Sequence, residues 1–284
     1  MNKVAVMTDT NSGIIPSEAE ENGIYLLQMP FFVDGKEFIE YGSMDYDEFF
    51  ARLSAGAEVS TSQPSPAALC DMWDRILKSN DQIIYIPMSS GLSGTCETSK
   101  MLAKEYNGKV LVVDNKRISV TLRSSVFDAL NLLKNGFNAE ETVEKLEKYA
   151  LNASIYISVS TLEYLKKGGR VTPAGAAIGS LLGIKPVLQI QGEKLDAYKK
   201  VRGMNAAIEA MIQGMENDLK TRFAGKEVAI RTAFTGNRSI AQEWSDIIAA
   251  HFPDYDIELD SLPVSISCHL GPGAIGVGIN EIIK

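Results

Sequence analysis

A hydroxyl-rich segment is the part of this sequence whose residue types most clearly suggest chemistry. It runs Ser89-Ser90-Gly91-Leu92-Ser93-Gly94-Thr95 and directly follows the apolar run 82–88. A β-branched run bounded by Pro and Gly predicts a buried strand, while Ser, Thr and Gly at the beginning of a helix supply capping oxygens and close backbone approach. Free hydroxyl and N–H groups then converge where an anion could bind. The same residues could also serve only as a helix cap and a turn.

Two further segments have the same character. In the first, Ser60-Thr61-Ser62-Gln63-Pro64-Ser65-Pro66, Ser65 and Pro66 suit the beginning of a helix, which leaves Thr61 and Ser62 without a structural role. The second, residues 265–274, is a predicted loop that contains His269, one of only two histidines. The three segments together favour a polar binding site over three unrelated caps.

The first half of the chain alternates strand-like and helix-like segments. This alternation predicts an α/β layer with a mainly parallel sheet, and Asp34-Gly35 predicts an antiparallel hairpin within it. Ligands bind at the carboxyl ends of the strands in such sheets, where the segment 89–95 would lie. The expected strands are 3–8, 24–32, 82–87 and 109–114, and the expected helices are 16–22, 45–54, 66–79, 94–106 and 117–135.

The second half opens with a predicted helix at 139–150 and then contains more short strands. We expect strands at 154–159, 186–191, 194–199, 227–234, 255–262 and 274–279, with helices at 172–182, 204–222 and 238–251. The sequence therefore predicts two domains, an N-terminal α/β domain of residues 1–152 and a C-terminal mixed α/β sandwich of residues 153–284. No long linker separates them, so we expect close packing with a ligand cleft between the domains.

The composition excludes several classes of function. The chain has 284 residues, 45% hydrophobic and 23% charged, with a net charge of −8, which indicates a globular protein that does not bind nucleic acid. The sequence has no apolar run of membrane-spanning length and begins without a signal segment, so we expect a cytoplasmic protein without stable membrane insertion. Neither the three cysteines nor the two histidines have metal-ligand spacing, so no metal is expected.

Four segments resemble the DegV family of bacterial fatty-acid-binding proteins, which includes the carrier subunit of the fatty acid kinase system. They occur in the family's order and, with the opening strand, cover nearly the whole chain. The opening turn departs from the family pattern at Asn11 and Ser12, so we assign no function to that turn. The matching segments are Thr61-Ser62-Gln63-Pro64-Ser65, Ser89 to Thr95, Thr161-Leu162-Glu163-Tyr164-Leu165-Lys166-Lys167-Gly168-Gly169-Arg170 and His269-Leu270-Gly271-Pro272-Gly273.

The resemblance implies an α/β protein that holds one long-chain fatty acid between its two domains and has no other cofactor. It further implies that a separate ATP-dependent fatty acid kinase phosphorylates the bound carboxylate to an acyl phosphate for phospholipid synthesis, so that the carrier has no catalytic residues of its own. Arg202 is a candidate for docking that kinase, or belongs to a simple solvated face. The residues expected around the carboxylate are Thr61, Ser62, Ser93, Gly94, Arg170 and His269.

The segment 174–184 is small and apolar on all sides. It is either a buried core helix or one wall of a tunnel for the acyl chain. In the second interpretation its large side chains would line the tunnel, namely Ile178, Leu181, Leu182 and Ile184.

Two other classes of function remain open. Ser93, His269 and an acid such as Asp9 could form the triad of a serine esterase acting on acyl esters, although Gly-x-Ser-x-Gly is absent. A lipid-responsive sensor that controls another partner is the second alternative. A nucleotide site is not expected. Residues 271–276 match the pattern Gly-x-Gly-x-x-Gly, but they do not lie in the βαβ unit that a dinucleotide site requires, and the sequence contains no Walker loop. His251, at a predicted helix end, is interpreted as structural.

Overall fold

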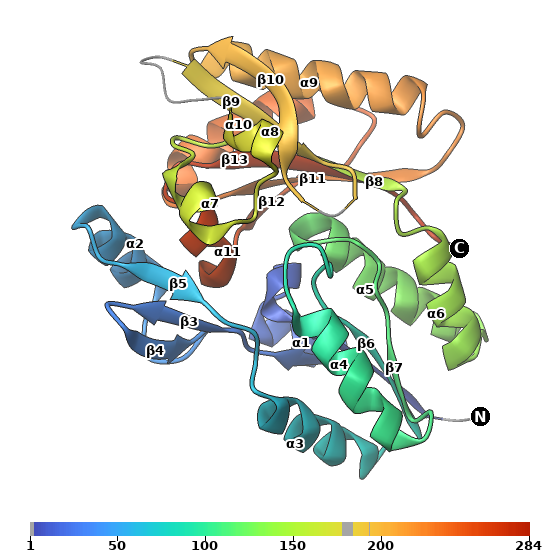
Figure 1. The fold of residues 1–284 in the computed structure, drawn as a ribbon. Coiled ribbons are helices and arrows are strands. Elements are labelled where there is room, and N and C mark those ends of the chain that lie inside the picture. Colours follow the sequence, from blue (N-terminus) through green and yellow to red (C-terminus); the bar gives the residue numbers. More distant parts are fainter. Residues whose placement is uncertain (1–2, 178–183, 193) are drawn as a thin grey trace.

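The first half of the chain forms a four-stranded parallel sheet in the order β2-β1-β6-β7 (Figure 1). The computed structural model describes residues 3–177, 184–192 and 194–284. Buried side chains alternate between the two faces of the sheet, as the period of two in a strand requires. The strands are β1 (Val4–Asp9), β2 (Ile24–Leu27), β6 (Gln82–Ile86) and β7 (Val110–Val112). The mainly parallel sheet predicted from the sequence is confirmed.

Helices cover both faces of this sheet. One face packs against α1 (Pro16–Glu21), α5 (Ser119–Lys134) and α6 (Ala139–Lys148). The other face packs against α3 (Pro66–Leu77) and α4 (Thr95–Ala103). Short 3-10 turns follow β1 at Thr10–Ser12 and α4 at Lys104–Tyr106.

A separate antiparallel sheet, β4-β3-β5, extends from the first half and is accompanied by α2 (Tyr46–Ser54). Its strands are β3 (Pro30–Val33), β4 (Lys36–Ile39) and β5 (Val59–Thr61). The hairpin expected at Asp34-Gly35 is confirmed, and both residues have positive φ. The single strand expected at 24–32 is wrong: the backbone N–H of Met29 instead donates to Thr10 Oγ1, and the chain passes into the second sheet there.

The second half contains a six-stranded mixed sheet, as predicted. Its order is β10-β9-β8-β13-β11-β12, and among these strands only β11 and β12 pair in parallel. The strands are β8 (Ala153–Ser158), β9 (Ile184–Ile190), β10 (Asp196–Arg202), β11 (Val228–Phe234), β12 (Glu258–Ser261) and β13 (Ile275–Glu281).

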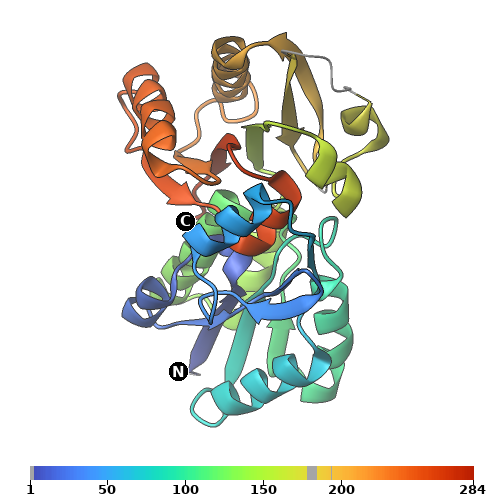
Figure 2. The same cartoon turned by 90° about the vertical axis from the view of Figure 1, so that its left-hand side faces the viewer.

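The two faces of the mixed sheet have different surroundings (Figures 1 and 2). Tyr156 points to the outer face, which α9 (Met204–Lys220) and α10 (Arg238–His251) cover. Its neighbours Ile155 and Ile157 point to the inner face, which meets the first half of the chain. The inner face also carries α7 (Glu163–Gly168), α8 (Pro173–Ala176) and α11 (Val264–Leu270).

Helix α11 is the main departure from the predicted elements, because a loop was expected there. Val264 and Cys268 on one side of the helix pack with Phe31 and Phe49 of the first half. This burial stabilises a helix that its Ser-rich sequence does not predict. Figure 2 shows α11, in red, beside α2 and the antiparallel sheet.

The domain boundary at residue 152 stays a prediction. It lies between β7, the last strand of the parallel sheet, and β8, the first strand of the mixed sheet. The chain then returns, since the backbone N–H of Ile283 donates to Asp128 of α5 and Ile283 packs in the core of the first half.

The helix expected at 172–182 is seen only as α8, and Ile178, Leu181 and Leu182 lie outside the described residues. Among the helices that the structure describes, none combines the length and the apolar character needed to cross a membrane.

Candidate functional site

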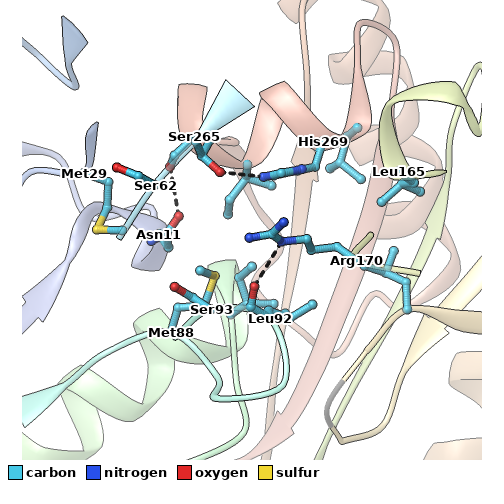
Figure 3. Close-up of a pocket in the computed structure, with 15 residues that line it drawn as sticks. Asn11, Met29, Ser62, Met88, Leu92, Ser93, Leu165, Arg170, Ser265 and His269 are labelled. Carbon is cyan, nitrogen blue, oxygen red and sulfur yellow. Dashed lines mark hydrogen bonds between the residues drawn. The ribbon is translucent and has the colours of Figure 1, made fainter. Parts of the chain in front are cut away.

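A cavity lies where the carboxyl ends of β1 and β6 meet α7 and α11 (Figure 3). Its polar side chains come from five segments distant in sequence, which the fold brings together. The lining includes Asn11 after β1, Thr61 and Ser62 at the end of β5, Ser93 after β6, Arg170 after α7, and Ser265 and His269 of α11. We call this space the head-group cavity. Five of the six residues expected around a carboxylate line it.

His269 is held in this cavity by Thr61. The Nε2 atom of His269 lies 2.8 Å from Thr61 Oγ1. Burial, together with the nearby charge of Arg170, lowers the pKa of His269 to about 4. The imidazole is therefore neutral at pH 7, and the ring nitrogen that carries its proton can donate one hydrogen bond.

Arg170 is the cation of the cavity. Its Nε donates to the carbonyl oxygen of Leu92 at 3.2 Å, and Nη1 donates to that of Gly168. Among the ion pairs of the described residues, none includes Arg170. The described hydrogen bonds of this half-buried guanidinium go to carbonyl groups and not to a carboxylate, which favours an anion in the cavity.

Gly168 leaves room for the imidazole of His269. A Cβ atom at this position would lie 2.2 Å from Nδ1 of His269, closer than any real contact. Its carbonyl also accepts from Arg170. The sequence placed Gly168 in a motif at a helix end, but its role as the close neighbour of His269 depends on the packing of α7 on α11.

The residues expected from the two hydroxyl-rich loops differ in their contact with the cavity. Ser93 lines it, with its Oγ 2.9 Å from Thr95 Oγ1. Ser62 also lines it, but its hydroxyl donates to the carbonyl of Gln63. Gly94 does not line the cavity: it is the exposed N-cap residue of α4, and its Cα faces Gln63.

An apolar cavity adjoins the head-group cavity. Ile118, Leu195, Ile266 and Leu270 line both, so the polar space continues into the apolar one. The further lining is almost wholly apolar and comes from the inner face of the mixed sheet and the beginning of α5. It includes Val120, Ile155, Ile157, Ile190, Ala233 and Leu262. We call this space the acyl cavity.

Three residues of the expected tunnel wall, Ile178, Leu181 and Leu182, lie outside the described residues, and for them the expectation stays a prediction. Ile184 begins β9 and lines neither cavity. Among the described residues, the glycine-interrupted strand β13 lines the acyl cavity through Gly276 and Gly278. A Cβ atom at Gly278 would lie 2.4 Å from Val120 Cγ2, so this glycine permits α5 to approach the sheet.

Asn11 and Ser265 are cavity residues to which the sequence assigned no role. Asn11 is 1% exposed and Ser265 is 5% exposed, and the Ser265 hydroxyl donates to Asn11 Oδ1 at 2.9 Å. The position of Asn11 just after the first parallel strand was an available signal. Nothing in the local sequence of Ser265 indicates that its helix joins the first half of the chain.

The described atoms do not form the esterase triad. The hydroxyl of Ser93 forms a hydrogen bond with Thr95, and the hydrogen-bond partner of His269 Nε2 is the hydroxyl of Thr61 and not that of Ser93. The carboxylate of Asp9 accepts from Met88 and Asn11. His251 lies at the end of α10 and pairs with Glu216, which agrees with a structural role.

One group of possible metal ligands occurs among the described residues: Cys96, Glu97 and Asp114, with atoms within 4.8 Å of one another. Asp114 already pairs with Lys116 and accepts from Ser90, which anchors the 89–95 loop. Burial raises the pKa of Cys96 to about 12, so its thiol is protonated and a poor ligand.

The chain belongs to the DegV family: the model for uncharacterised proteins of that family matches residues 3–281. A DegV domain-containing protein of Deinococcus radiodurans is 28% identical over 281 residues, covering 98% of this chain and 99% of the relative.

Solved structures of the family have the same fold. A fatty-acid-binding DegV family protein of Thermus thermophilus superposes with a TM-score of 0.89 at 26% identity, covering 98% of this chain and 99% of its own. A fatty-acid-binding DegV family protein of Streptococcus agalactiae has a TM-score of 0.88 at 28% identity, and 99% of both chains is covered. These similarities confirm the α/β fold, with a mainly parallel sheet followed by a mixed sheet, that was expected from the sequence.

Proposed function

We propose that this protein binds one long-chain fatty acid, with the carboxylate in the head-group cavity and the hydrocarbon chain in the acyl cavity. The observation that carries the proposal is the junction of the two spaces: at one end an arginine without an ion pair among the described residues, together with several hydroxyl groups, and at the other end an apolar space. An amphipathic anion matches both ends. Fatty-acid binding by structural neighbours that cover 98% and 99% of the chain supports the proposal.

The charge distribution fits such a ligand. A net charge of −8 gives no long-range attraction for an anion, so affinity must come from local groups and from the apolar chain. Burying roughly 16 methylene groups contributes on the order of 12 kcal/mol before the costs of binding are subtracted. Arg170, His269, Thr61 and Ser93 then satisfy the carboxylate, which would otherwise be costly to bury.

We further propose that the protein acts in the cytoplasm as a carrier for a separate ATP-dependent fatty acid kinase. In this reaction a carboxylate oxygen attacks the γ-phosphorus of ATP, ADP leaves, and an acyl phosphate forms for phospholipid synthesis. Arg170 through its charge, and the neutral imidazole of His269 by donating a hydrogen bond, would offset the repulsion between the two anions. Arg202, exposed at the end of β10, is the residue we propose for kinase docking.

Native mass spectrometry of the protein purified from bacteria tests the binding proposal. We expect a noncovalent fatty acid in about equimolar amount, because an apolar cavity favours an apolar occupant. Recovery of no fatty acid, together with no binding of added palmitate or oleate, would disprove it.

A reconstituted reaction tests the carrier proposal. The loaded protein with ATP and the kinase from the same cell should yield an acyl phosphate that hydroxylamine traps. The protein alone should give none and should not cleave acyl esters. Ester hydrolysis lost in Ser93→Ala would instead favour an esterase, and a lipid-dependent complex with a protein other than a kinase would favour a sensor.

A further inference from the structure

Glu40 is a buried carboxyl group beside the head-group cavity to which the proposed function assigns no role. It directly follows β4 and is 2% exposed. One oxygen accepts a hydrogen bond from Thr10 Oγ1, and the other accepts from the backbone N–H of Ser265 at 2.7 Å. Glu40 therefore joins the turn after β1 to the first turn of α11.

The helix geometry relates this contact to the ligand site. Ser265 and His269 are four residues apart on α11, so they lie on the same side of the helix, one turn from each other. Both line the head-group cavity. The hydrogen bond from the Ser265 N–H to Glu40 fixes the first turn of α11 on this side. One turn further along the helix, Thr61 holds the imidazole of His269.

The surroundings of Glu40 are polar but lack a counter-ion among the residues with described ion pairs. Thr10 Oγ1 also accepts from the backbone of Met29, so Glu40 is part of a longer chain of hydrogen bonds. Burial, with a smaller contribution from the charge of Asp9, raises the pKa of Glu40 to about 7. Burying a carboxyl group without a counter-ion costs free energy, which suggests that the hydrogen bonds of Glu40 have a structural function.

We propose that Glu40 is a positioning residue of the head-group cavity, which seats α11 by bridging Thr10 and Ser265 and thereby fixes His269 against the ligand. The inference about the ligand depends on the proposed fatty-acid binding. The inference about His269 does not, because it concerns only contacts between residues of this chain.

The test uses the fact that the chain has only two histidines, so that nuclear magnetic resonance can follow both imidazole rings. We expect Glu40→Ala to shift the His269 resonances and leave those of His251 in place. Glu40→Gln keeps an acceptor for the Ser265 N–H and should retain the wild-type His269 signal. Affinity for cis-parinaric acid should fall about tenfold or more in Glu40→Ala and stay within about threefold in Glu40→Gln.

Asp128→Asn is the matched control. Asp128 is also buried and also accepts one backbone N–H, that of Ile283, but it does not line either cavity. This variant should lose stability without changing the His269 signal or the affinity.

A folded Glu40→Ala protein with unchanged His269 resonances and unchanged affinity would overturn the proposal. If Glu40→Ala does not fold, Glu40→Asp replaces it: the shorter side chain withdraws the carboxyl group from Ser265, with the same expected shift and the same overturning result. A wild-type protein that binds no fatty acid would refute the proposed function, while the His269 signal would still decide the role of Glu40.

Discussion

Thr61 Oγ1 lies 2.8 Å from Nε2 of His269, which joins the end of β5 to α11 across 208 positions of the sequence. The contact spans the two halves of the protein at the point where we place the fatty-acid carboxylate. The site is therefore built from segments that lie far apart in the sequence.

Replacing Thr61 with Val tests this contact, because valine keeps the shape and removes the hydroxyl. The change should cost about 1.5–3 kcal/mol of binding, or about a 10- to 100-fold loss of fatty-acid affinity. Binding should not vanish, since the acyl chain is unaffected. Thr98→Val removes a hydroxyl outside the cavity and should leave the affinity unchanged. Equal affinities for both variants in a fluorescence titration would place the carboxylate elsewhere.

Arg170→Met should weaken fatty-acid binding more than any single hydroxyl removal, because it takes the cation from the cavity. Arg170→Lys should recover only part of the affinity, since an ammonium group lacks the paired donors of guanidinium. Arg75→Met, on the exposed side of α3, is the control. The proposal requires a fatty alcohol of the same length to bind Arg170→Met about as well as wild type; a large loss would indicate a structural role for Arg170.

Gly168→Ala should displace the imidazole of His269, because the new methyl group would lie 2.2 Å from Nδ1. We expect a stability loss of about 1–3 kcal/mol together with weaker ligand binding. Gly214→Ala is the matched control, since its Cβ would meet the ring of Tyr156 at 2.7 Å on the outer face of the mixed sheet. It should lower the melting temperature without lowering affinity.

The pKa of His269 gives a prediction about pH. Its folded value is about 4 and its unfolded value 6.5, so the unfolded chain binds more protons between these values. His269 therefore contributes stability that is present above pH 6.5 and is lost as the pH falls through about 4, with a total on the order of 3 kcal/mol. The free energy of unfolding of wild type minus that of His269→Gln should show this fall.

Asp9 and Glu40 oppose this effect in the wild type. Burial raises the pKa of Asp9 to about 6 and that of Glu40 to about 7, so their contribution is lost as the pH rises through those values. The comparison with His269→Gln isolates the histidine, and His251→Gln serves as the control. Identical pH dependence in wild type and His269→Gln would show that the imidazole is not buried as described.

Ala233→Leu should select against long acyl chains, because Ala233 of β11 lines the acyl cavity and a larger side chain would fill part of it. Affinity for stearate should fall more than affinity for decanoate in a competition assay. Ala210→Leu on the outer helix α9 overpacks the core without touching the cavity and should change neither affinity. Equal losses for both chain lengths would contradict the assignment of the acyl cavity.

Most elements of the fold were predictable from the sequence alone. The alternation of apolar strands and amphipathic helices predicted the parallel sheet and the mixed sheet, since local periodicity reflects which face of an element is buried. The hydroxyl-rich segments and the histidine pointed to Thr61, Ser62, Ser93 and His269, and the resemblance to the DegV family added Arg170. These five residues do line one cavity.

The elements that complete the site depend on tertiary packing and could not be predicted from the sequence. Helix α11 forms because Val264 and Cys268 are buried against Phe31 and Phe49, residues more than 200 positions earlier, and local propensity carries no record of that contact. The same holds for Asn11, Ser265 and Glu40, whose hydrogen bonds depend on that packing. The described wall of the acyl cavity depends on Gly278 of β13, which lets α5 approach the sheet, so it is a property of packed elements that a local sequence window does not contain.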